Sequence, residues 1–250
     1  MLKAVEKGDN EFVKFCCRDV FGTRISCLYN CYSTDYDFVK FWKQTDDDGN
    51  IISAVSRIDG DATLTSTGKN AEELYDFLII VGFRTVQCEK KITELMGAKS
   101  SLEGYVVEYI KNKNEIKEIQ ADNIFRPKEI YDIIKSANLV GVGDYLPWLS
   151  DTTFRFNRGV TSVLSAIVDG KTVSCAMKLF STDTAVLLGA VATRPEYRGR
   201  GLAGALVTRL AESEKNKRVE LLCKHDGIVE FYKSIGFEVK NEWSIITDEQ

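Results

Sequence analysis

The sequence has little that would point to a membrane, a linker or a nucleic-acid partner. It contains no run of about eighteen apolar residues, so no membrane-spanning helix is expected. Three prolines and no low-complexity tract argue against a long disordered linker. The first residues lack the apolar core of a signal peptide. A net charge of −4 argues against non-specific binding to nucleic acid.

Cysteine and histidine usage also argues against a disulfide framework and a metal centre. Seven cysteines with scattered spacing fit reduced thiols, and we therefore expect a cytoplasmic protein. Four of them lie between residues 16 and 31, but the only histidine, His225, lies far away in the sequence. The acidic turn at residues 45–50 misses the EF-hand register, because Gln44 and Val55 would take its first and last positions. We expect no metal.

The first half of the chain has the pattern of an α+β domain, which we place at residues 1–104. A helical pattern covers residues 10–31, and a second one, at residues 71–81, ends at Gly82. Strand patterns cover residues 37–44, 51–55, 62–67 and 83–88. Gly104 is expected to break the chain before the second domain, at residues 105–250.

The second half alternates strands and helices. Pro127 starts a helix that continues to residue 137, and residues 116–119 are expected to form the first strand. An Asp169-Gly170 turn joins strands at residues 162–168 and 172–179. A third strand is expected at residues 182–191. A strand at 218–223 should run parallel to it, and a helix around Tyr232 and a strand at 237–246 should follow.

The most informative stretch is an apolar strand followed by a glycine-rich turn and a helix. Residues 198–204 read RGRGLAG, and apolar residues then recur at helical spacing up to Leu210. The first N–H groups of a helix have no internal partner, and the helix dipole adds positive charge there. Glycines let a ligand approach the backbone, and Arg198 and Arg200 add two charges. The stretch therefore predicts an anion site suited to a diphosphate.

Two common phosphate-binding patterns fit this stretch poorly. The Walker pattern is absent, because no lysine follows Gly204. The dinucleotide pattern G-x-G-x-x-G can be placed on Gly199, Gly201 and Gly204. That pattern requires an acidic residue about 20 residues later, at the end of a second strand. Glu220 instead stands at the start of a strand, so a nicotinamide-dinucleotide domain is a minor alternative.

The stretch resembles the acetyl-CoA signature of the GNAT N-acetyltransferase superfamily, R/Q-x-x-G-x-G/A. Arg198, Gly201 and Ala203 meet it. Downstream, residues 226–237 resemble the family's second conserved segment, with Tyr232 at the position of its tyrosine and Asp226 where asparagine is usual. The resemblance covers residues 117–247. It implies an α/β acyl-CoA N-acyltransferase fold with a mixed central sheet, preceded here by a smaller α+β domain.

The resemblance also implies the chemistry. The family uses acetyl-CoA as acyl donor and transfers the acetyl group directly to an amine, which here would be a small molecule or a peptide. Tyr232 would protonate the leaving thiolate, since an ordinary tyrosine with a pKa of about 10 holds its proton near neutral pH. The residues expected to contact acetyl-CoA are Val191, Ala192, Thr193, Arg198, Gly199, Arg200, Gly201, Leu202, Ala203, Gly204, Asp226 and Phe231.

The base and the acceptor pocket are less clearly indicated. The strand that ends at Val191 carries no glutamate, where many family members have one, so Glu196, His225 or a chain of water molecules could serve. The resemblance places aromatic residues 145–149 and 154–156 along the acceptor pocket, although core packing would explain them equally well. The acceptor and the oligomeric state are not indicated by the sequence.

Two further alternatives follow from the pattern. Residues 77–83 match residues 231–237 in their phenylalanine, aliphatic and glycine positions. This is either an internal repeat, with the N-terminal half a degenerate copy lacking the anion site, or a coincidence of two capped helices. The missing glutamate and Asp226 also allow a module that binds acyl-CoA as a sensor or scaffold without transferring the acyl group.

Overall fold

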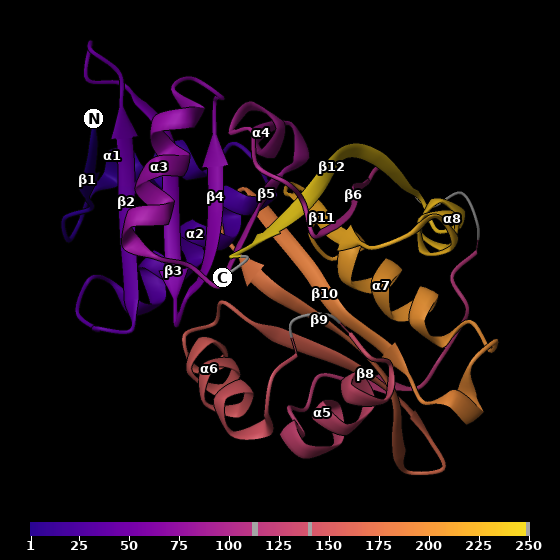
Figure 1. Cartoon of the computed structure of the whole chain (residues 1–250). Coiled ribbons are helices and arrows are strands. Elements are labelled where there is room, and N and C mark those ends of the chain that lie inside the picture. Colours follow the sequence, from indigo (N-terminus) through magenta and orange to yellow (C-terminus); the bar gives the residue numbers. More distant parts are fainter. Residues whose placement is uncertain (112–114, 140–141, 249–250) are drawn as a thin grey trace. The chain divides into compact units, whose positions relative to one another are not determined.

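The computed structural model of the chain describes residues 1–111, 115–139 and 142–248 (Figure 1). The chain divides into two compact units. The N-terminal unit comprises Met1–Val106, Leu222–His225 and Lys240–Gln250, and the C-terminal unit comprises Val107–Leu221 and Asp226–Val239. Neither unit is therefore one continuous stretch. The predicted domain boundary near residue 105 stays a prediction.

The N-terminal unit contains strands and helices in the order β-α-α-β-β-β-α-β-α-β. They are β1 (Leu2–Ala4), α1 (Asn10–Cys16), α2 (Val20–Tyr32), β2 (Val39–Thr45), β3 (Ile51–Ile58), β4 (Asp61–Ser66), α3 (Ala71–Val81), β5 (Thr85–Glu89), α4 (Lys90–Leu95) and β6 (Leu102–Tyr109), whose last residues belong to the other unit. Strands β1 to β4 pair antiparallel in chain order, and β4 pairs parallel with β5. The other edge of β5 pairs with residues 243–247 of the last strand, β12.

The helical pattern at residues 10–31 is two helices, and the break between them lies at residues 17–19. Asp9 caps α1 by accepting the Phe12 N–H, and Asp19 caps α2 by accepting the Gly22 N–H. Gly22 lies inside α2, where a Cβ would stand 2.1 Å from the Cys16 carbonyl oxygen. The glycine therefore permits the close contact of two helices and does not end one.

The expected break at Gly104 is wrong for a similar reason. Gly104 lies within β6, and a Cβ there would stand 2.2 Å from the Cys223 carbonyl oxygen and 2.6 Å from the Trp243 ring. A glycine inside a strand often marks such a close approach. One hydrophobic core cluster of the N-terminal unit lies between the sheet and helices α3 and α4, around Leu64, Leu74 and Leu78.

The second half of the chain repeats the same order of elements, although the last residues of β11 and most of β12 belong to the N-terminal unit. These elements are β7 (Ala121–Asp122), α5 (Pro127–Ser136), α6 (Tyr145–Asn157), β8 (Ser162–Val168), β9 (Lys171–Ser181), β10 (Ala185–Thr193), α7 (Leu202–Glu212), β11 (Arg218–Cys223), α8 (Asp226–Ser234) and β12 (Phe237–Thr247). A short 3₁₀ helix, η1 (Pro195–Tyr197), precedes α7. The expected first strand at residues 116–119 is not formed, and β7 begins at Ala121.

The pairing of the C-terminal strands also repeats that of the first unit. Strands β7 to β10 pair antiparallel in chain order, and β10 pairs parallel with β11, as expected. Asp169 and Gly170 both have positive φ in the turn between β8 and β9, as a tight hairpin turn requires. Helix α5 packs Ile130, Ile133 and Ile134 on one face of this sheet. Helix α7 contacts β8, β9 and β10.

The shared order and pairing show that the fold contains an internal repeat. The repeat differs from the alignment that suggested it, however. By position in the fold, α3 corresponds to α7, and α4 corresponds to α8. Residues 77–83 therefore do not correspond to residues 231–237, and Leu78 does not take the place of Tyr232. Any helix that ends at Gly-Phe before a strand gives the same local pattern.

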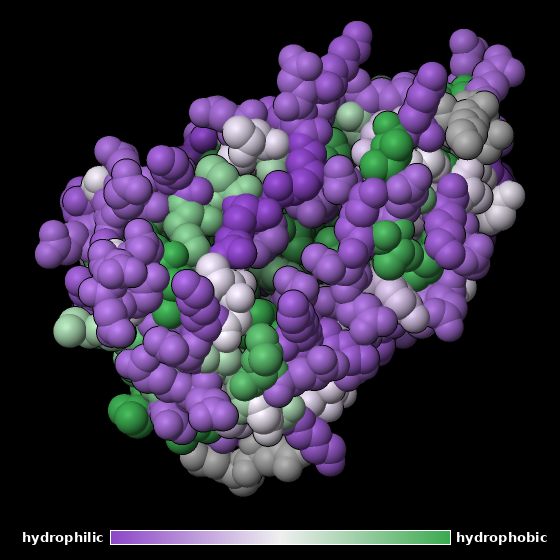
Figure 2. All heavy atoms as spheres, turned by 90° about the horizontal axis from the view of Figure 1, so that it is seen from above, coloured by the Kyte–Doolittle hydropathy of each residue, from purple (hydrophilic) through white to green (hydrophobic). Residues whose placement is uncertain are grey.

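Hydrophilic residues cover most of the face drawn in Figure 2, and hydrophobic residues form separate small areas on it. No helix among the described residues has the length and apolar character needed to cross a membrane. Nor does the described part of the chain contain a group of three or more His, Cys, Asp or Glu residues that could hold a metal ion.

Candidate functional site

The turn before α7 has a backbone that only glycine adopts easily. Gly199 has a φ of +73°, and Gly201, the residue that caps the helix, has a φ of +75°. A side chain at either position would be strained, because left-handed backbone costs an L-residue about 1–2 kcal/mol. The two glycines fold residues 198–201 into a tight turn, and α7 begins directly behind it.

The N–H groups of this turn and of the first turn of α7 have no acceptor in the described part of the chain. Within the described residues, no hydrogen bond is donated by the N–H groups of residues 199–204, and the first helical bond runs from Ala205 to Gly201. Gly201 supplies no side-chain cap, and the first turn of α7 carries no acidic residue. The positive end of the helix dipole is therefore not neutralised by the chain itself.

Three cationic side chains surround this turn. Arg198 donates its Nε hydrogen to the Thr193 carbonyl at 3.1 Å, and Arg200 donates from Nη2 to the Glu196 carbonyl at 3.0 Å. Lys117 Nζ donates to the Arg200 carbonyl at 2.7 Å. All three hydrogen bonds go to backbone carbonyls, and no carboxylate among the described residues forms an ion pair with any of the three side chains. Unpartnered amides and three cations are the features that favour an anion at this turn.

Strand β10 loses its partner on one side just before this turn. Its parallel pairs with β11 run only from Ala185–Arg218 to Leu188–Leu221. On the other side, its register with β9 shifts between Gly189 and Ala192, where Ala190 takes a φ of +48°. This β-bulge bends the strand. Residues 189–191 and 193 are partly exposed, so one backbone edge of β10 is open to pair with an amide-bearing ligand.

The remaining residues expected to contact acetyl-CoA lie on α8. Phe231, 36% exposed, packs near the first turn of α7, since a Cβ on Gly204 would stand 3.8 Å from its ring. Asp226 is exposed at the start of α8. Tyr232 is 6% exposed, and its ring centroid lies 5.0 Å from that of Phe231 and 5.5 Å from that of Phe237. Its ring is therefore largely core, and a catalytic role depends on the reach of its hydroxyl.

The corresponding turn of the N-terminal unit has a similar backbone, but its N–H groups donate hydrogen bonds to side chains of the chain itself. Gly68 has a φ of +86°, and Asn70, which caps α3, has a φ of +52°. Here the Gly68 N–H donates to Ser66 Oγ at 3.0 Å, and the Lys69 N–H donates to Thr67 Oγ1 at 3.3 Å. The first turn of α3 also carries Glu72 and Glu73, which would repel an anion. Of the two related turns, only the C-terminal one is suited to a diphosphate.

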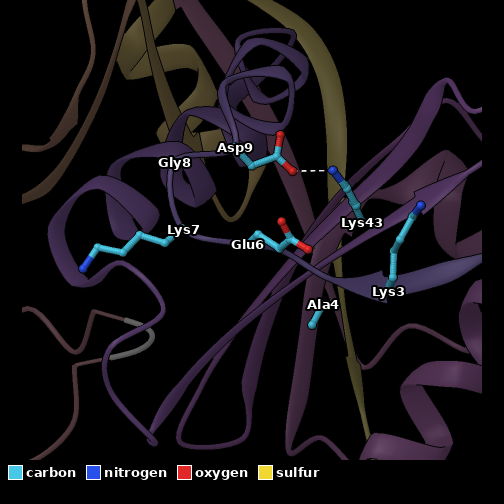
Figure 3. Close-up of a pocket in the computed structure, with 7 residues that line it drawn as sticks. All are labelled: Lys3, Ala4, Glu6, Lys7, Gly8, Asp9 and Lys43. Atoms are coloured by element: carbon cyan, nitrogen blue, oxygen red, sulfur yellow. Dashed lines mark hydrogen bonds and ion pairs between the residues drawn. The ribbon is translucent and has the colours of Figure 1, made fainter.

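A pocket of about 270 Å³ in the N-terminal unit is also charged, and two of the charges that line it, those of Lys43 and Asp9, form an ion pair (Figure 3). Lys43 lies against the Asp9 carboxylate, and both side chains are mostly buried. Burial alone would raise the pKa of Asp9, but the hydrogen bonds from Lys43 and from the Phe12 N–H outweigh it and hold the pKa below its ordinary value. Because Asp9 also caps α1, the pair has a structural explanation.

Aromatic side chains gather where α5 and α6 meet. The Tyr131 ring centroid lies 5.0 Å from that of Tyr145 and 5.3 Å from that of Trp148, and all three contact the core beneath α5. The ammonium of Lys128 stands 5.2 Å from the centre of the Tyr145 ring. This cluster contacts Ala190 and Ala192 of the bulged strand through the same core. Tyr145 and Trp148 belong to the segments that the sequence assigned either to an acceptor pocket or to core packing, and Tyr131 joins them from α5.

The structure does not single out a general base. Glu196 lies exposed on η1, and His225 is exposed and belongs to the N-terminal unit. Cys175, beside the bulged strand, is disfavoured as a nucleophile, because burial raises the pKa of its thiol to about 12. Ser165 Oγ is a buried polar atom without a hydrogen-bond partner, on the same side of the sheet as Cys175. Nothing in the sequence pattern distinguished it from an ordinary strand serine.

Sequence reasoning missed two features of the site. The bulge at Ala190 was not predicted, because the apolar run through Val191 is typical of a regular strand; Gly189, next to the bulge, was the local signal that could have indicated it. Lys117 lies far from the glycine-rich turn in the sequence, so no local pattern could connect the two. Arg198, Gly199, Arg200 and Gly201, by contrast, all lie in the predicted turn.

Residues 160–239 match the family model described as an acetyltransferase (GNAT) domain. No curated protein sequence matches the chain at a significant level. Its fold is similar to that of a tandem GNAT protein from the clavulanic acid biosynthesis pathway, solved without AcCoA, with a TM-score of 0.62 and 12% identity over 98% of this chain and 97% of that one.

Two further solved structures match along nearly their whole length. A GCN5-related N-acetyltransferase from Sphaerobacter thermophilus has a TM-score of 0.63 and 15% identity, over 98% of this chain and 94% of that one. A Drosophila protein has a TM-score of 0.68 and 16% identity, over 98% of each chain. At these identities the likeness concerns the fold.

Proposed function

We propose that this chain, which carries a GNAT acetyltransferase domain at residues 160–239 and has the fold of tandem GNAT proteins, transfers an acetyl group from acetyl-CoA to an amine. The observation that carries the proposal is the set of unpartnered N–H groups at residues 199–204, beside Arg198 and Arg200. In the proposal, residues 105–250 form the transferase domain and residues 1–104 a degenerate copy without a donor site.

The turn and the bulged strand have separate tasks in this proposal. The N–H groups of residues 199–204 bind the diphosphate, with Arg198 and Arg200 beside it. Residues 191–193 bind the pantetheine arm along the open edge of β10, as a neighbouring strand would pair. Leu202 and Ala203 contribute N–H groups within the same first turn. Phe231 and Asp226, which both lie on α8, contact the coenzyme.

The acyl transfer then needs a polarised carbonyl and a protonated leaving group. The Val191 N–H donates to the thioester carbonyl oxygen as that oxygen takes on negative charge. The amine nitrogen, having lost a proton to a base, forms a bond to the carbonyl carbon, and the carbon–sulfur bond breaks. Tyr232 gives its proton to the departing sulfur and regains one from solvent. The products are an amide and the free coenzyme thiol, with no acyl-enzyme.

The acceptor belongs to the same proposal. We assign it to small amines or peptide amines that reach the aromatic cluster of Tyr131, Tyr145 and Trp148, because this cluster contacts the bulged strand through a shared core. Aromatic faces attract cations, and an amine arrives as an ammonium. A cytoplasmic location is included in the proposal, since the reducing cytoplasm suits the seven cysteine thiols.

Two measurements test the proposal. Calorimetry should give binding of acetyl-CoA and CoA, and much weaker binding of NAD. A panel of amines incubated with the protein and acetyl-CoA should then release free thiol with at least one amine. A protein that binds NAD and ignores CoA would overturn the donor site.

A second function is supported by the burial of Tyr232. A chain whose tyrosine only anchors α8 would bind acyl-CoA as a sensor or scaffold without turnover. CoA binding without thiol release from any amine would favour this alternative over the enzyme.

A further inference from the structure

Lys117 contacts the glycine-rich turn on the side of the Arg200 carbonyl. Its Nζ donates to the Arg200 carbonyl at 2.7 Å, and its Cδ stands 3.4 Å from the position of a Cβ on Gly201. The lysine comes from the segment before β7, far away in the sequence. The turn itself carries no other hydrogen bond from a side chain outside residues 194–204 within the described part of the chain.

The segment that carries Lys117 is held in place. Arg209 of α7 donates from Nη1 to the Ile119 carbonyl at 3.2 Å, and the Ile167 N–H of β8 donates to the Gln120 carbonyl at 2.9 Å. Lys117 is thus the side chain of an anchored segment, which lowers the entropy lost when its hydrogen bond forms.

Peptide geometry relates Lys117 to the anion site. The peptide group that joins Arg200 and Gly201 is planar and trans, so its C=O and its N–H point in opposite directions. Lys117 therefore binds the carbonyl side, and the Gly201 N–H faces away from the lysine. A cation on the carbonyl oxygen draws electrons from the amide and makes its N–H a stronger donor, as in a cooperative hydrogen-bond chain. Lys117 also fixes a peptide that lies between two glycines with positive φ.

The corresponding peptide of the N-terminal unit has no such contact with any described residue. Asn70 caps α3 as Gly201 caps α7, so Lys69 takes the position of Arg200. No side chain among the described residues donates a hydrogen bond to the Lys69 carbonyl, and Gln44 Nε2 instead donates to the next carbonyl, that of Asn70, at 3.1 Å. Within the described part of the chain, the charged contact is therefore found in the turn whose amides are unpartnered and not in its counterpart.

We propose that Lys117 is a positioning residue for the diphosphate of acetyl-CoA, acting through the Arg200–Gly201 peptide rather than by touching the coenzyme. The inference rests on the proposed function, because it needs the diphosphate at residues 199–204. It assigns to Lys117 two effects, a fixed orientation of the Gly201 N–H and a stronger hydrogen bond from it.

The test compares Lys117→Met, Lys117→Arg and the control Lys171→Met, which removes an equal charge from the exposed start of β9. Calorimetry should give about fivefold weaker acetyl-CoA binding for Lys117→Met, corresponding to the loss of about 1 kcal/mol. Lys117→Arg should recover most of the loss, and Lys171→Met should stay near the wild type. With an acceptor amine, the loss should fall on KM for acetyl-CoA and leave kcat unchanged.

Two further readouts keep the result interpretable. The ¹⁵N resonance of Gly201 in the ligand-free protein should move upfield in Lys117→Met, because the amide loses its polarising cation. Binding of acetyl-pantetheine, which lacks the diphosphate, should be the same in Lys117→Met and the wild type.

The outcomes separate this inference from the proposed function. A wild-type protein that does not bind acetyl-CoA would sink the proposed function and this inference with it. A wild type that binds, together with a Lys117→Met variant of equal affinity and unmoved Gly201 resonance, would overturn the role of Lys117 alone. Equal losses in Lys117→Met and Lys171→Met would also overturn it, since they would indicate net charge as the cause.

Discussion

Replacing Gly201 by alanine tests the turn that the proposed function depends on. Gly201 has a φ of +75°, and an L-residue in that conformation costs about 1–2 kcal/mol. The substitution also lowers the conformational entropy of the unfolded chain, which stabilises the folded protein by about 0.4–1 kcal/mol. The new Cβ would stand 3.4 Å from Lys117 Cδ, the movable part of a flexible side chain, so little more is added. The net expectation is a loss of about 1 kcal/mol.

Gly204→Ala is the matched control, because it adds the same methyl group three residues later. Gly204 has an ordinary helical backbone, and alanine is favoured over glycine inside a helix by about 1 kcal/mol. Its Cβ would lie 3.4 Å from Ile235 Cγ2 and 3.8 Å from the Phe231 ring, and these close contacts reduce the stabilisation. We expect Gly204→Ala to be neutral or slightly stabilising.

The assay is thermal unfolding followed by acetyl-CoA calorimetry on each variant. For a chain of this size, about 1 kcal/mol corresponds to a Tm lower by about 2–4 °C for Gly201→Ala. Its affinity should fall about tenfold, the cost of one misplaced hydrogen bond to a charged group, about 1.5 kcal/mol. Gly204→Ala should have the Tm and the acetyl-CoA affinity of the wild type, or a slightly higher Tm. Equal stabilities in the two variants, or full affinity in Gly201→Ala, would refute the reasoning.

Three further predictions concern single groups. Tyr232→Phe keeps the ring contacts with Phe231 and Phe237, so the CoA affinity and the Tm should not change. It removes the hydroxyl proton, so thiol release should be about 100-fold slower. An unchanged rate would leave Tyr232 as a helix anchor. The folded pKa of Asp9 lies below its ordinary value of 3.8, so its stabilising effect is complete above that pH and is lost as the pH falls through the folded pKa. Urea titrations of Asp9→Asn and wild type should therefore differ by about 1–2 kcal/mol at pH 7 and converge in acid; a constant difference would contradict the ion pair. Cys175 has a pKa of about 12 and no exposed surface, so iodoacetamide at pH 8 should not label it until the protein unfolds. Mass spectrometry would detect the label. Labelling of the folded protein would show that the core beneath α5 opens.

Much of the fold could be predicted because its signals are local. The helix over residues 71–81 has the predicted bounds, since its apolar spacing and its terminal glycine lie within one short stretch. The parallel strand at 218–223 and the Asp169-Gly170 hairpin turn are confirmed for the same reason. The glycine-rich turn before α7 is where the pattern predicted it.

The errors share a physical cause, which is contact between residues distant in sequence. Gly104 was expected to break the chain, yet it lies inside β6, where Cys223 and Trp243 leave no room for a side chain. The repeat was inferred from a match between residues 77–83 and 231–237, although the fold relates α3 to α7. Lys117 and the bulge at Ala190 became apparent only when separate segments met. The roles of the site residues stay predictions.

The pairing of β5 with residues 243–247 of β12 has a consequence for how the protein is made. A ribosome that has synthesised residues 1–106 has not yet made the strand that lies along one edge of β5. Until then that edge keeps unsatisfied N–H and C=O groups, which are open to neighbouring chains. The N-terminal unit can therefore be finished only after the C-terminal unit has emerged. A fragment cut at residue 106 should aggregate, and supplying residues 237–248 as a separate peptide should rescue it.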